Sequence, residues 1–475
     1  MDPLLFYREA TIVATEGLPA LYRLTHTAHP PLLQGLVALA FGLVGRSPAA
    51  YTAVGVACFA VGALMVNAVV SRCYSSRAAF AATLLLYSCP LVLVNAFYPT
   101  HETVLLAVVA SALYFFAADR FVPFRWSLIP LVFLKQTALV ALASFFAARL
   151  LDRLRRGAGR RRLADDVADF LPAVAAGLAW AVFLRALGGS EWRGDLLGQA
   201  AGGSTYAYLG ERLLHLGVFN AFLRRNLENA LIYNWQWSIT LSALALTLGT
   251  AARRREPPSP GAFRCATFLA IFSPSYALLV LSIPTWTIPR YGIPLLLGPY
   301  VALGVAAARI GNRGRFAALV TVLWAVSWVA NLSSLDPVTA RHGALEIYGQ
   351  RLYDVPEENA GADRLTYNLQ FLDAVASQNA LVAAALRSGA DGLVTDCAAL
   401  KLDEKLAAIA LHPEYYPYPA ARPLFCAGPE GLGDPGVAQR LTGRVLYVGR
   451  DDRSRLQALV DGLGASISIV GDSPS

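Results

Sequence analysis

The stretch that decides the fold is residues 126–151, WSLIPLVFLKQTALVALASFFAARLL. It is apolar over most of its length, and arginines flank it on both sides, for example Arg125 before it and Arg153 after it. Arginine collects in the cytoplasmic loops of membrane proteins, so both ends of this stretch are predicted to face the cytoplasm. A single crossing cannot satisfy that condition. We therefore predict a broken hairpin whose tip is Lys135-Gln136-Thr137.

The whole chain has the composition of a membrane protein. Of its 475 residues, 56% are hydrophobic, and the mean hydropathy is +0.47. Its apolar blocks predict a polytopic α-helical membrane protein with about ten membrane segments, since ~20 apolar residues cross a bilayer. The segment 31–45 is too short to cross and is predicted to lie at the interface. The net charge of +8 comes largely from arginines in short loops, which argues against a nucleic-acid partner. Besides the hairpin, the predicted crossings are 51–71, 78–97, 103–119, 167–187, 230–249, 265–284, 291–309 and 316–333.

The pattern changes at Asp336, after which no block is long enough to span a bilayer. Residues 444–449 read as a strand, 453–462 as an amphipathic helix and 466–470 as a second strand, and 392–395 as a further strand. We therefore predict a membrane domain over 1–335 and a soluble α/β domain over 336–475. The last crossing places this second domain outside the cytoplasm, where Cys397 and Cys426 either form a disulfide or remain free thiols.

The predicted topology brings separated polar residues to the extracytoplasmic face. The opening stretch, residues 2–33, is predicted to be a reactive polar loop, and it contributes an acidic residue and a histidine. Carboxylates, cations and an aromatic residue at a membrane surface suit a lipid phosphate whose head group reacts there, because cations bind the phosphate and a carboxylate takes a proton. The candidate residues are Asp2, His29, His101, Glu102, Lys135, Arg290 and Tyr291.

These residues also carry a family resemblance. The acidic opening stretch with His29-Pro30-Pro31-Leu32, the segment Thr100-His101-Glu102-Thr103, the Lys-Gln-Thr turn, and Arg290-Tyr291 followed by Pro294 occur in one order. Together they resemble the GT-C glycosyltransferases, and most closely the protein O-mannosyltransferase and lipid A aminoarabinose transferase group. The resemblance covers roughly residues 2 to 310. It implies a GT-C-like bundle and an extracytoplasmic active site.

The resemblance also implies an activity and a role for each residue. The donor is a polyprenyl-phosphate-linked sugar, which a lipid, glycan or protein acceptor attacks with inversion at the anomeric carbon. Asp2 matches the first catalytic carboxylate and is the expected general base, and Glu102 matches the second and orients acceptor or sugar. Lys135 and Arg290 neutralise the leaving phosphate, and His29, His101 and Tyr291 line the substrate site. No cofactor is required, and a divalent metal is possible although the residues do not indicate one.

Other interpretations stay open at this stage. The same cations suit a lipid-linked sugar transporter or flippase, and the chain also fits a catalytically inactive membrane scaffold. The GT-C group places a membrane helix before the acidic loop, so we expect a first helix upstream of Met1. Each candidate also has a structural explanation, such as helix capping for Glu102 or an interfacial position for Lys135. Lysine occurs only at positions 135, 401 and 405, which suggests a high-GC bacterial gene and hence the bacterial inner membrane.

Overall fold

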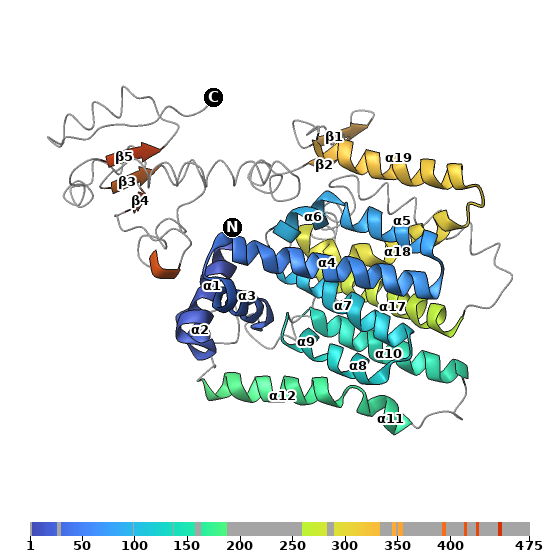
Figure 1. Cartoon of the computed structure of the whole chain (residues 1–475), viewed down its shortest axis with the longest axis horizontal. Helices are drawn as coiled ribbons and strands as arrows, with labels where there is room; N and C mark the ends of the chain where they lie inside the picture. The colour runs from blue at the N-terminus through green and yellow to red at the C-terminus, as the bar shows by residue number, and fades with distance from the viewer. Residues whose placement is uncertain are drawn as a thin grey trace.

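A computed structural model of the chain describes residues 2–25, 30–97, 99–135, 137–156, 163–187, 259–282 and 289–332. Beyond these it describes only the short segments 344–347, 350–354, 392–395, 413–415, 424–426 and 445–448. The first group forms a bundle of roughly side-by-side helices, and the second consists of strands and one helical turn (Figure 1).

The helices fall into an N-terminal, a central and a C-terminal set along the chain. The first set is α1 (Asp2–Glu16), α2 (Leu18–Leu24), α3 (Leu32–Val44), α4 (Pro48–Cys73), α5 (Ser76–Tyr87) and α6 (Pro90–Phe97). The second is α7 (His101–Ala117), α8 (Phe121–Ser127), α9 (Ile129–Val132), α10 (Ala138–Arg156), α11 (Leu163–Ala168) and α12 (Leu171–Ala186). The third is α17 (Pro260–Ser282), the 3₁₀ helix η3 (Pro289–Leu296), α18 (Leu297–Ala308) and α19 (Arg313–Leu332).

Helix starts follow the local sequence. The hydroxyls of Ser47, Ser75 and Ser259 each accept a hydrogen bond from a backbone N–H three residues on, so they cap α4, α5 and α17. Gly17, with φ +85°, ends α1 in a conformation that favours glycine, and Pro19 stands in the first turn of α2.

Among the described residues, three helices are long and apolar enough to cross a membrane, and they cover Pro48–Cys73, Pro260–Leu279 and Tyr291–Ala308. The pair Ser76–Tyr87 and Leu91–Phe97 is a fourth candidate, bent by 69°. The predicted crossing over 78–97 therefore corresponds to a bent pair of helices, and Pro90 explains the bend because proline removes a helical hydrogen bond. The predicted break at Lys135–Thr137 is confirmed, since α10 begins at Ala138.

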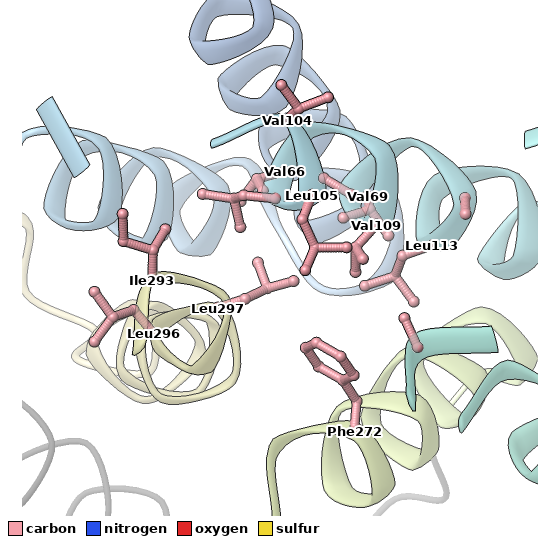
Figure 2. Packing of buried hydrophobic residues seen from close by; sticks show 14 of the residues in the cluster. Val66, Val69, Val104, Leu105, Val109, Leu113, Phe272, Ile293, Leu296 and Leu297 are labelled. Carbon is pink, nitrogen blue, oxygen red and sulfur yellow. The ribbon is translucent and has the colours of Figure 1, made fainter. Parts of the chain in front are cut away.

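The core lies where α7 meets α4, α17, η3 and α18. Figure 2 shows Val66 and Val69 of α4, Leu105 and Val109 of α7, and Leu297 of α18 converging on one apolar region. Thirteen of the seventeen residues of α7 are buried, so this helix runs through the centre of the bundle. Because α7 is fixed on several sides, the polar residues of its first turn are held in place.

The opening stretch is helical, which corrects our prediction of a polar loop. In α1 the side chains of Phe6, Tyr7 and Ala10 are buried, and they belong to the same core cluster as Val37 and Phe41 of α3. These apolar residues outweigh the charged ones that suggested a loop, because their burial against α3 stabilises a helix. In Figure 1, α1, α2 and α3 lie together at one end of the bundle.

The C-terminal segments include two small sheets. Strands β1 (Ala344–Ile347) and β2 (Gln350–Asp354) pair antiparallel, and a three-stranded parallel sheet has the order β4-β3-β5, from Leu424–Cys426, Gly392–Thr395 and Val445–Val448. The predicted strands at 392–395 and 444–449 are thereby confirmed. The predicted helix 453–462, strand 466–470 and Cys397 lie outside the described residues, and the domain boundary at 335 stays a prediction.

Candidate functional site

The centre of the site is a buried ion pair between two of the predicted residues. Lys135 Nζ lies 2.5 Å from Glu102 Oε1, and the two residues are only 3% and 2% exposed. Glu102 stands in the first turn of α7, and Lys135 in the break between α9 and α10. The helix break therefore has a visible consequence: it carries an ammonium group to the beginning of the central helix.

Two tyrosines border this ion pair. The Lys135 ammonium lies 3.9 Å from the centre of the Tyr291 ring, in the geometry of a cation–π contact. Tyr276 of α17 is fully buried, and its hydroxyl is beside Thr137 and within electrostatic reach of Glu102. Residues from α7, the 133–137 break, α17 and η3 thus meet at one place.

Helix α1 brings a further carboxylate to the same end of the bundle. Glu9 is 1% exposed, and the Gln34 side-chain amide of α3 donates a 2.6 Å hydrogen bond to its Oε2. Three residues earlier on α1, Phe6 packs edge-on against His101, with ring centroids 4.7 Å apart. Residues three apart lie on one face of a helix, so the face of α1 that carries Glu9 is the one that meets the start of α7.

Helix α3 and the break are joined directly. The backbone N–H of Leu32 donates a 2.8 Å hydrogen bond to the carbonyl of Phe133, two residues before Lys135. Aromatic rings continue from there, because Phe133 packs on Trp180 of α12, and Trp180 packs on Tyr22 of α2. Burial, with a smaller contribution from the Glu9 carboxylate, raises the pKa of the Tyr22 phenol. Tyr22 is therefore a neutral hydrogen-bonding group on this side of Glu9.

The structure brings together four of the seven predicted residues, namely His101, Glu102, Lys135 and Tyr291. Asp2 is the first residue of α1 and Arg290 belongs to η3, but their side chains lie outside the described part of the structure, and so does His29. The roles predicted for these three residues stay predictions.

Three residues of the site were missed in the sequence. Glu9, Gln34 and Tyr276 all fall within apolar surroundings, at 1%, 0% and 0% exposure. Glu9 lies three residues from both Phe6 and Ile12, a spacing that predicts a buried acid on the apolar face of a helix. A polar loop has no such face, so the predicted loop does not point to Glu9. No comparable signal in the sequence singles out Tyr276 from other tyrosines of apolar helices.

The site combines two held carboxylates with one ammonium group. A carboxylate can take a proton from a hydroxyl nucleophile, and an ammonium group can stabilise negative charge that develops on a leaving group. Within the described part of the chain, no three His, Cys, Asp or Glu residues are grouped to hold a metal ion. These residues can carry out acid–base and electrostatic chemistry.

A second set of charges lies at the other end of α7. Arg264 of α17 lies 2.9 Å from Asp119 and 3.1 Å from Asp152, and it donates a 2.7 Å hydrogen bond to the carbonyl of Phe116. Arg264 and Asp152 are each 2% exposed. This arginine joins α7, α10 and α17.

The same end holds two more buried aspartates. Asp166 lies 2.9 Å from Arg149 and 3.0 Å from Arg153, and Asp169 lies 3.1 Å from Arg125 and 3.8 Å from Arg149. These contacts tie α11 and the turn after it to α8 and α10. Each aspartate here has two arginine partners.

The fold is similar to that of a protein of known structure. The crystal structure of ArnT from Cupriavidus metallidurans bound to undecaprenyl phosphate matches with a TM-score of 0.50 and 17% sequence identity, over 82% of this chain and 68% of that one. The apo structure of the same protein matches with a TM-score of 0.48 and 16% identity, over the same shares of the two chains. No family model and no curated protein matches the sequence.

Proposed function

We propose that this chain is a membrane glycosyltransferase that moves a sugar from a polyprenyl-phosphate donor to an acceptor on the extracytoplasmic face. The observation that carries the proposal is the buried Glu102–Lys135 pair at a helix break. Ionisable residues inside membrane helices are costly and are kept for function, so such a pair points to a ligand site. The shared fold with ArnT, which was crystallised with undecaprenyl phosphate, supports a lipid phosphate as that ligand.

The proposed reaction is a single displacement with inversion. A carboxylate takes the proton of the acceptor hydroxyl, and the acceptor oxygen forms a bond to the anomeric carbon. The bond from that carbon to the phosphate oxygen breaks, and its electron pair stays on the phosphate, whose charge grows from −1 toward −2. Lys135 stabilises this growing charge.

Two carboxylates are held near the reaction centre. Glu102 contacts Lys135 directly, whereas Glu9 is fixed by Gln34 on the facing helix α1. Asp2, the base that the family resemblance implies, is at the start of the same helix α1. We assign the acceptor's proton to one of these three groups, and single substitutions distinguish them.

The test is a transfer assay with the full chain reconstituted in lipid. A panel of undecaprenyl-phosphate pentoses and hexoses is supplied with acceptor lipids, and release of undecaprenyl phosphate is measured. Lys135→Met and Glu102→Gln are expected to lower the turnover rate roughly a hundredfold or more, the scale seen when a residue that stabilises the transition state is removed. Glu9→Gln and Asp2→Asn identify the base by the larger loss.

Ser111→Ala is a suitable control, because the Ser111 hydroxyl bonds only the carbonyl of Ala107 in its own helix. It is expected to leave turnover unchanged. Transfer that survives both Lys135→Met and Glu102→Gln would contradict the proposed site. Movement of the intact donor across the bilayer without release of undecaprenyl phosphate would show a transporter instead.

A further inference from the structure

The Glu102 carboxylate competes with any phosphate that binds Lys135. In this structure the Lys135 ammonium group is already neutralised by a carboxylate at 2.5 Å, inside a region where both side chains are buried. Charges at this distance in a low-dielectric interior attract each other strongly. A phosphate that binds Lys135 must therefore displace Glu102 or share the ammonium group with it.

Two hydroxyl groups border the pair, and they lie beside each other without a well-formed hydrogen bond to another described group. Tyr276 is 0% exposed and Thr137 is 1% exposed, and neither hydroxyl makes a hydrogen bond of acceptable geometry within the described part of the chain. A buried hydroxyl without a hydrogen-bond partner destabilises the folded protein. Two such groups side by side at a charged pair indicate donors that a bound anion would satisfy.

Another buried tyrosine shows that a missing hydrogen bond does not by itself mark an anion site, because the charged surroundings are also needed. Tyr87 of α5 also has a buried hydroxyl without a partner, but this hydroxyl lies against the backbone of Gly62 in apolar surroundings. Tyr276 differs because its hydroxyl is within electrostatic reach of Glu102 and next to Thr137 on the break that carries Lys135. The ion pair and the hydroxyls are thus two independent observations at one place.

We infer that Glu102 masks Lys135 in the empty protein and that the donor phosphate takes its place, accepting hydrogen bonds from Tyr276 and Thr137. This inference rests on the proposed function. The exchange keeps the ammonium group neutralised before and after binding, so the buried cation is never left alone. It also releases the Glu102 carboxylate at the moment when the sugar arrives, so that Glu102 becomes available to the acceptor only when a donor is present.

The two hydroxyls make the exchange selective for an anion. The two hydroxyls lie beside each other, so at least one of their O–H groups has no acceptor in the described part of the chain, and Glu102 is paired with the ammonium group. A hydrogen bond to a charged group contributes about 1.5 to 3 kcal/mol, which corresponds to roughly tenfold or more in affinity. An uncharged polyprenol gains much less from these two donors.

The experiment measures binding of undecaprenyl phosphate and of undecaprenol to the full chain in nanodiscs. Tyr276→Phe and Thr137→Val are each expected to weaken binding of undecaprenyl phosphate about tenfold and to leave undecaprenol unchanged. Glu102→Gln is expected to tighten binding of the phosphate, because the competing charge is gone. Lys135→Met is expected to remove the preference for the phosphate over the alcohol.

Tyr87→Phe is the matched control, since it removes another buried and unpartnered phenol hydroxyl from the bundle. It is expected to bind both lipids like the parent, and melting curves confirm that each variant is folded. Unchanged phosphate affinity in Tyr276→Phe and Thr137→Val, or weaker binding in Glu102→Gln, would overturn the exchange while leaving the proposed function intact. A parent protein that does not prefer undecaprenyl phosphate to undecaprenol would overturn the proposed function itself.

Discussion

The two ends of helix α7 use buried charges in different ways. At its start, Glu102 pairs with Lys135, and the two hydroxyls beside them have no well-formed hydrogen bond to another described group. At the other end of α7, the carbonyl of Phe116 in the last turn and Asp119 just after the helix both contact Arg264. Arg264 also pairs with Asp152. About 21 Å of helix separates Glu102 from Phe116, at about 1.5 Å per residue.

The two ends of α7 differ in the number of partners that surround their buried charges. The Arg264 guanidinium group contacts oxygens of α7, of the turn after α7 and of α10. The neighbouring Asp166 and Asp169 have two arginine partners each. Arginine suits such a role because it remains charged and presents several donors in a fixed plane. The pair at Glu102 uses lysine, a compact point charge that can exchange partners more readily. We infer that the arginine end fastens the bundle and that the lysine end is left open to a ligand.

The largest expected effect is on stability at the arginine end. Arg264→Ala removes the buried guanidinium group that contacts Asp152, Asp119 and the carbonyl of Phe116, and removing one partner of a buried ion pair typically costs about 3 to 5 kcal/mol. The melting temperature of the protein in detergent should therefore fall strongly. Arg153→Ala is the control, because Asp166 keeps Arg149 and Arg153 is partly exposed. Equal melting temperatures for the two variants would show that Arg264 stabilises the bundle no more than the partly exposed Arg153 does.

At the lysine end, stability and activity should separate. Lys135→Met alone leaves Glu102 buried without its cation, so the protein is expected to lose about 3 to 5 kcal/mol. The double variant Lys135→Met with Glu102→Gln replaces the pair by neutral groups of similar size, and it should recover most of the melting temperature. Its transfer activity should not recover. A double variant that regains activity would show that the pair is structural, like the arginine network.

The sequence predicts some parts of this comparison well and others poorly. The break at Lys135 was predictable because arginine on both sides of an apolar block forces the chain to turn back. The sequence predicts that Lys135 and Glu102 lie at the same membrane face. It does not predict their ion pair, since side-chain contact depends on how α7 and α10 pack. The charged residues of the opening stretch predict a loop, whereas the spacing of Phe6, Tyr7 and Ala10 favours the helix α1 that the structure shows. Glu9 was missed for the same reason.

A smaller effect is expected from close helix contacts at each end. A methyl group on Gly304 would lie 2.6 Å from the carbonyl oxygen of Ala78, and one on Gly55 would lie 2.2 Å from that of Ala96. Backbone must shift in both cases, so Gly304→Ala and Gly55→Ala are each expected to cost about 1 to 3 kcal/mol. Gly42→Ala is the control, since nothing lies within 4 Å of the new methyl group.

The two glycine variants should differ in activity. Gly55 packs against Pro99, which stands just before the first turn of α7. The carbonyl of Pro99 accepts a hydrogen bond from the Tyr51 hydroxyl. A shift there moves the turn that holds Glu102, so Gly55→Ala is expected to lower turnover more than Gly304→Ala does at equal loss of melting temperature. Similar turnover in the two variants would indicate that the site end tolerates displacement as well as the fastened end.

The smallest expected effect concerns the contact between the C-terminal part and α1. Tyr415, in the turn Pro413–Tyr415, donates a hydrogen bond to the Glu16 carboxylate, and Arg46 donates one to the carbonyl of Glu414. The hydrogen bond to Glu16 raises the pKa of Tyr415 to about 12, because it favours the protonated phenol. The contact should therefore be complete below pH about 10, the ordinary pKa of tyrosine, and should be lost as the pH rises through about 12.

A difference titration checks this sign. The ultraviolet absorbance of the parent minus that of Tyr415→Phe isolates one phenol, and at pH about 11 it should show little phenolate. Repeating the subtraction in a Glu16→Gln background should show mostly phenolate at the same pH, because the carboxylate that favours the protonated form is gone. Because this bond is exposed, neither substitution should change the melting temperature appreciably, unlike Arg264→Ala at the far end of α7. Equal phenolate in both backgrounds would show that the turn does not contact α1 in solution, and the position of Glu9 would then depend on the packing of α1 within the bundle.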